Sequence, residues 1–79
     1  MKQIIKKEGA VYWNDVDDSK PIFVKEKDRF VGMLVYNYNF GNSWIIAIGK
    51  GFGATGYHQS LVDCLESGLI FGYTYYIED

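Results

Sequence analysis

The fold is decided by residues 60–77, SLVDCLESGLIFGYTYYI, where a helical pattern gives way to a strand pattern. Ser60 has the side chain of a helix N-cap, and the acidic residue three positions later makes a short variant of the capping box. Gly72 is the expected stop, because glycine readily takes the left-handed conformation that ends many helices. The pattern predicts a helix over approximately residues 61–71 and a final strand over residues 73–77.

The predicted helix has one apolar face. Leu61, Cys64 and Leu65 recur at helical spacing, and we expect them to pack on a sheet. Gly68 falls on the same face, where the lack of a side chain would let the helix approach the sheet closely.

The chain before the helix reads mainly as strands. Residues with high β-propensity gather in short segments that polar or glycine-containing turns separate. Lys27 and Asp28 form the predicted turn of a hairpin. The predicted strands cover residues 3–7, 10–13, 21–26, 29–38 and 43–48.

The longest of these segments is apolar on both sides. Strict alternation over residues 29–38 places Phe30 on the side of Leu34, and Met33 with Val35 on the other side. Because both sides are apolar, we expect a central strand, covered by the helix on one face and partly covered on the other.

These elements predict the α+β class. The order is strands, then a helix, then a final strand, which favours a mostly antiparallel four- to five-stranded sheet with one helix packed on one face. A chain of 79 residues has room for one domain, so we expect a single compact domain over residues 1–79.

The side-chain composition favours binding over catalysis. The chain has seven Tyr, five Phe and two Trp but only one His and one Cys. Tyr and Trp offer large contact areas at a low cost in conformational entropy. We therefore expect a small non-enzymatic protein-binding module, with no catalytic residue, no metal site and no cofactor.

Charge and hydropathy narrow the class of partner. The formal net charge is −2 and the basic residues are scattered, whereas proteins that bind nucleic acids usually show a basic patch. No apolar run reaches the roughly 18 residues of a membrane helix, and the N-terminus lacks the apolar stretch of a signal peptide. The lone Cys64 fits a reducing compartment. We expect a cytoplasmic protein that binds another protein or itself.

One helix can cover only one face of a sheet, so part of the aromatic content should lie on the open face. An exposed patch of this kind marks a binding or self-association surface. The candidate partner-binding residues are Trp13, Tyr36, Tyr38, Phe40 and Tyr75.

The glycine-rich segment GKGFGATG, residues 49–56, offers an alternative function. Residues 51–56 match G-x-G-x-x-G between a strand and a helix, where backbone amides can approach a phosphate. Only about 23 residues follow, too few for the rest of a dinucleotide-binding fold. The segment is either a plain connection or a site for a small ligand, a nucleotide or an anion. The candidate ligand-binding residues are Gly51, Gly53, Thr55, Gly56 and His58.

Two further patterns have simpler interpretations. Asp15 begins a spacing of acidic and hydroxyl groups like that of a calcium loop, but Lys20 stands where such a loop needs glycine. This favours a solvated acidic loop. His58 lies near Ser60 and Cys64, but Ser60 has the capping role and Cys64 belongs to the core face.

Residues 60–73, SLVDCLESGLIFGY, together with the small size and the content of Lys, Ile, Tyr and Asn, resemble the small accessory proteins of tailed bacteriophages. The resemblance implies a non-enzymatic protein that binds a host factor and modulates or inhibits it. It rests on no family motif, so it assigns a role to no individual residue.

Overall fold

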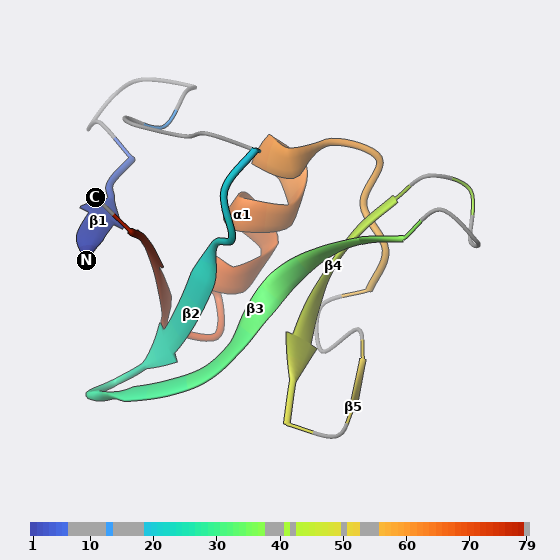
Figure 1. The fold of residues 1–79 in the computed structure, drawn as a ribbon. Helices are drawn as coiled ribbons and strands as arrows, with labels where there is room; N and C mark the ends of the chain where they lie inside the picture. The colour runs from blue at the N-terminus through green and yellow to red at the C-terminus, as the bar shows by residue number, and fades with distance from the viewer. Residues whose placement is uncertain are drawn as a thin grey trace.

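Six strands form one antiparallel sheet in this computed structural model, and a helix packs on one side of it (Figure 1). The structure describes residues 1–6, 13, 19–37, 41, 43–49, 51–52 and 56–78. The elements are β1 (Lys2–Ile4), β2 (Phe23–Glu26), β3 (Arg29–Asn37), β4 (Ser43–Ile48), β5 (Gly51–Phe52), α1 (Leu61–Leu69) and β6 (Tyr73–Ile77). The strand order is β1-β6-β2-β3-β4-β5. The predicted α+β class is confirmed, with strands, then the helix, then a final strand.

Short strands complete the two edges of the sheet. β5 lies inside the glycine-rich segment that was expected to be a loop, and its Phe52 pairs with Ala47 of β4. β1 pairs with β6 at the other edge. The predicted strand over residues 10–13 is described only at Trp13, which forms an isolated bridge with Lys6. In the described part of the chain, no helix has the length and apolarity needed to cross a membrane.

α1 begins and ends close to the predicted positions. The Ser60 hydroxyl accepts a hydrogen bond of 3.1 Å from the backbone N–H of Asp63, which confirms the predicted cap. The chain leaves the helix through Gly72, whose φ is 78°. The helix is two residues shorter than predicted because the N–H groups of Phe71 and Gly72 bond to carbonyls three residues back, a tighter turn than the α-helix.

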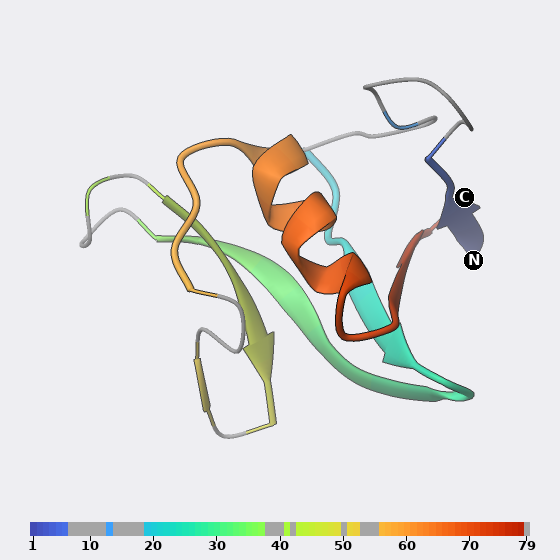
Figure 2. The same cartoon turned by 180° about the vertical axis from the view of Figure 1, so that it is seen from behind.

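The core lies between α1 and one face of the sheet, and Figure 2 shows the helix crossing in front of that face. Each fully buried aliphatic side chain contributes roughly 1.5–3 kcal/mol through the hydrophobic effect. The buried core residues are Ile4, Trp13, Ile22, Val24, Leu34, Ile46, Cys64, Leu65, Tyr73, Tyr75 and Ile77.

Gly68 sets the close approach of the helix to β6. A side-chain Cβ at this position would collide with the Tyr75 hydroxyl and lie 3.0 Å from the Tyr73 ring. The Tyr75 hydroxyl instead donates a buried hydrogen bond of 2.9 Å to the carbonyl of Leu65. The predicted close contact at Gly68 is confirmed, and tyrosines of β6 form its other side.

The hairpin between β2 and β3 contains an irregularity that changes which side chains share a face. Its turn is at Lys27 and Asp28, as predicted. The register then shifts, because Lys25 pairs with Phe30 whereas Val24 pairs with Gly32. β3 therefore has one residue more than β2 over this stretch, which is a β-bulge.

The bulge moves Phe30 to the face opposite the helix. Met33 lies on that face too, because it pairs with Phe23, while Leu34 is in the core. The extra residue, Val31, packs against the core. The expectation that Phe30 shares a side with Leu34 is therefore wrong, because strict alternation fails at a bulge.

Candidate functional site

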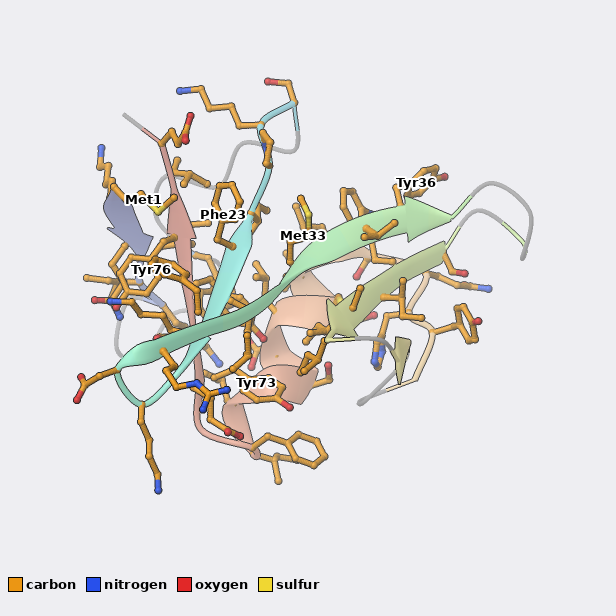
Figure 3. The ribbon with its side chains drawn as sticks, turned by 60° about the horizontal axis from the view of Figure 1, so that its bottom comes forward. Met1, Phe23, Met33, Tyr36, Tyr73 and Tyr76 are labelled. Atoms are coloured by element: carbon orange, nitrogen blue, oxygen red, sulfur yellow. The ribbon has the colours of Figure 1, made fainter. Side chains whose placement is uncertain are left out.

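The sheet face opposite α1 is the candidate site. A row of directly paired residues crosses five strands on this face: Gln3, Tyr76, Phe23, Met33 and Ala47. Figure 3 looks onto this face with the helix behind the sheet, and Met1, Tyr76, Phe23 and Met33 spread across its front. We call this surface the open face; it is covered at its β4 end, where Ile45, the partner of Val35, is 0% exposed.

Three aromatic rings pack together on the open face. The Phe30 ring lies 5.8 Å from the Tyr76 ring at 74° and 6.4 Å from the Phe23 ring at 80°, measured between ring centroids and planes. These edge-to-face contacts match the preferred arrangement of aromatic quadrupoles. The side chain of Phe30 is nevertheless 51% exposed. A large apolar surface thus remains in contact with solvent.

Lys25 lies among these rings. Its Nζ atom is 4.8 Å from the centroid of Phe30 and 4.9 Å from that of Tyr76, within the range of a cation–π interaction. Among the residues that the structure describes, no carboxylate pairs with Lys25. We name Phe23, Lys25, Phe30 and Tyr76 the open-face cluster.

Further apolar side chains extend this surface. Met1 and Ile5 are exposed, and Ile5 follows β1 with the parity of Gln3. Its neighbour Lys6 points the other way, because the Lys6 ammonium forms an ion pair of 2.8 Å with Glu66 of α1. The open face thus carries an apolar patch with aromatic side chains at its centre.

Two of the predicted partner-binding residues are buried under the helix. Tyr75 is 0% exposed and Trp13 is 7% exposed, and their rings pack edge to face at 5.6 Å. The prediction that they lie on an exposed face is wrong, because α1 covers the face of β6 that carries Tyr75. The Trp13 indole N–H is buried with no acceptor among the described residues.

The other three predicted aromatic residues do not join the open-face cluster. Tyr36 is half-buried and packs against Trp44 at 5.2 Å, on the core side of the sheet. Tyr38 and Phe40 lie outside the described residues. The sequence interpretation missed Phe23, Phe30 and Tyr76. Once Tyr75 is buried against α1, strand alternation forces its neighbour Tyr76 to the opposite face, but the sequence does not show which of the two is buried. A bulge that redirects Phe30 has no comparable signal.

The alternative ligand-binding residues are only partly described. Gly51 belongs to β5, and Gly56 has a left-handed φ of 90°. The backbone of His58 exchanges two hydrogen bonds with Trp44, of 2.6 and 2.9 Å, which joins this segment to β4. Gly53 and Thr55 lie outside the described residues, so ligand binding by this segment stays a prediction.

The reactive side chains of the core are held in their neutral forms. Burial raises the pKa of the Cys64 thiol from 9.0 to about 12. Burial also raises the pKa of the Tyr75 hydroxyl, with smaller contributions from Cys64 and Tyr73. Thiolate is the nucleophilic form of cysteine, so burial disfavours the reactive form of this thiol.

No family model, no curated protein and no solved structure matches the chain.

Proposed function

We propose that this protein is a small non-enzymatic module that binds a protein partner through its open face. The observation that carries the proposal is the exposure of Phe30 in the middle of an aromatic cluster, on the side of the sheet that α1 leaves uncovered. Exposed apolar patches with aromatic centres are typical of surfaces that dock on other proteins.

The energetics support docking at this cluster. The packed rings are held by neighbouring strands, so little conformational entropy would be lost on binding. Covering the exposed half of Phe30 would contribute about 1 kcal/mol through the hydrophobic effect alone. Residues in the centre of an interface often exceed 2 kcal/mol when truncated, because their neighbours exclude water around them.

The resemblance to small phage accessory proteins extends this proposal to the kind of partner. The partner is then a host protein in the cytoplasm, and binding alters or blocks its activity. The residue chemistry of the open face suits this role, because its aromatic and apolar side chains offer contact area.

Two matched variants test the site. Phe30→Ala and Phe71→Ala each remove a phenylalanine that is 51% exposed, but Phe71 stacks on Tyr73 at the end of the helix, away from the open face. Host proteins retained on immobilised wild-type protein are identified, and the affinity of each purified candidate is measured by calorimetry. We expect Phe30→Ala to weaken binding at least about 30-fold and Phe71→Ala to change it less than about threefold.

Folding of both variants is checked by urea denaturation. Comparable losses of stability would remove unfolding as an explanation of the difference in affinity. If both variants bind every retained protein as tightly as the wild type, the open face is not the binding surface.

A further inference from the structure

The strands at the centre of the open face carry one charged side chain among their described residues. Among the described residues on this face of β2, β3, β4 and β6, Lys25 is the only one with a charged side chain. Phe30 flanks it on one neighbouring strand and Thr74 on the other. The acidic Glu26 has the opposite parity, because it pairs with Tyr73 of the core.

A partner that covers the cluster must also cover this ammonium. Removing a charge from water is costly unless an opposite charge and hydrogen bonds replace the lost hydration. The two rings compensate part of the charge through cation–π contacts, but the described residues supply no carboxylate. A carboxylate on the partner would supply the negative charge that the described residues lack.

This requirement disfavours a second copy of the chain. In a two-fold dimer formed by the open face, the centres of the two patches meet, so each Lys25 would lie close to the other. The two like charges would be desolvated together, and the described residues on this face of β2, β3, β4 and β6 place no carboxylate between them. The face is equally poor for a nucleic acid, because phosphate backbones are bound by several cations and the described residues on this face of β2, β3, β4 and β6 offer one.

We propose, building on the proposed function, that the open face binds an amphipathic segment of a partner protein in which a carboxylate stands among apolar side chains. The apolar side chains cover Phe23, Phe30 and Tyr76, and the carboxylate pairs with the Lys25 ammonium. The pairing sets which partner is accepted, because an apolar segment without the acid would leave a buried charge unpaired.

A displayed peptide library selected on the wild-type protein tests this proposal. The selected peptides are synthesised, and their dissociation constants are measured by fluorescence polarisation. We expect Asp or Glu flanked by apolar residues in the selected peptides. Lys25→Met, which keeps an apolar stem, should weaken binding at least about tenfold. Lys25→Glu should weaken it further, and replacing the peptide acid by Lys should restore binding to that variant.

Lys27→Glu is the matched control for Lys25→Glu. It makes the same change in net charge, but at an exposed position in the hairpin turn. It should change affinity less than about threefold at physiological salt, since exposed charges are well screened. Phe30→Ala separates the two proposals. If Phe30→Ala abolishes peptide binding while Lys25→Met does not, the open face is the binding site but the proposal that the partner supplies a carboxylate is wrong. If neither variant affects binding, both proposals fail.

The remaining outcomes also decide against an acidic partner segment. If the library yields no binding peptide, the proposal of an acidic partner is overturned. It is also overturned if the wild-type protein is a dimer in light scattering and Phe30→Ala converts it to a monomer, because the occupant of the open face is then a second copy of the chain. Binding of an oligouridylate that is lost in Lys25→Met would identify a single-stranded nucleic acid as the occupant.

Discussion

Tyr75 combines two roles in a single buried side chain. Its ring packs edge to face on Trp13, and its hydroxyl donates to the carbonyl of Leu65 in the middle of α1. Cys64 is likewise fully buried, as a small thiol in the same cluster. Both groups titrate only at alkaline pH, and both are held neutral by burial. The fold therefore depends on keeping these protons.

We expect the free energy of unfolding to fall as the pH rises above 9. The Cys64 thiol has a pKa of 9.0 when solvated and about 12 in the folded protein. Between these values the unfolded state has released a proton that the folded state retains, so rising pH favours unfolding. Urea denaturation followed by circular dichroism at pH 7 to 11 measures this loss.

Cys64→Ala is the control for the thiol. Its stability should fall less steeply between pH 9 and 11 than that of the wild type, although the raised pKa of Tyr75 keeps part of the slope. Identical slopes in the two proteins would show that the thiol does not contribute.

At the scale of elements, one helix and one strand determine how the core is built. α1 presents Cys64, Leu65 and Gly68 to the sheet, and β6 presents Tyr73 and Tyr75. The helix can lie this close only because Gly68 has no side chain. Gly68 thus makes room for the face of β6 that carries Tyr73 and Tyr75, and Tyr76 lies on the other face.

Gly68→Ala should lower the free energy of unfolding by about 1–3 kcal/mol. Alanine has the higher helix propensity, by about 1 kcal/mol, but its Cβ would collide with the Tyr75 hydroxyl, and overpacking of this kind outweighs the propensity. Chemical denaturation of the single variants, Gly68→Ala and Tyr75→Phe, and of the double variant measures the coupling. The double variant should lose less stability than the sum of the two, because Tyr75→Phe removes the colliding atom. Additive losses would place the cost elsewhere.

At the scale of the whole molecule, the two ends of the chain complete the sheet together. β1 pairs with β6, and Figure 1 shows the N- and C-termini side by side. The Lys6–Glu66 ion pair adds a link between the end of this segment and α1. Such partly exposed pairs contribute about 0–1 kcal/mol, so the core contact of Ile4 is the stronger attachment. β1 is also the element that brings Met1 to the open face.

Ile4→Ala should cost about 2–5 kcal/mol, the usual range for truncating a buried isoleucine, because Ile4 is 1% exposed. The adjacent Ile5 is 54% exposed and points away from the core, so Ile5→Ala should cost less than about 1 kcal/mol. Urea denaturation of the two variants tests whether β1 belongs to the cooperative unit. Equal and small losses would show that β1 detaches before the rest of the domain unfolds.

The sequence by itself determined the local elements. The Ser60 cap, the apolar spacing of Leu65 and its neighbours, and the Gly72 stop specify α1 through interactions within a few residues. The hairpin turn at Lys27 and the strand Ser43–Ile48 were predicted for the same reason. The order of these elements then restricted the fold to an α+β arrangement.

Only the tertiary structure decided which aromatic residues are exposed. Tyr75 and Tyr76 are adjacent and chemically identical, and one is core while the other is on the open face because α1 packs on one side of β6. Phe30 reaches the open face only through a bulge between β2 and β3. Burial depends on contacts between residues that are distant in the chain, and a shift of one residue in register exchanges the two faces of a strand.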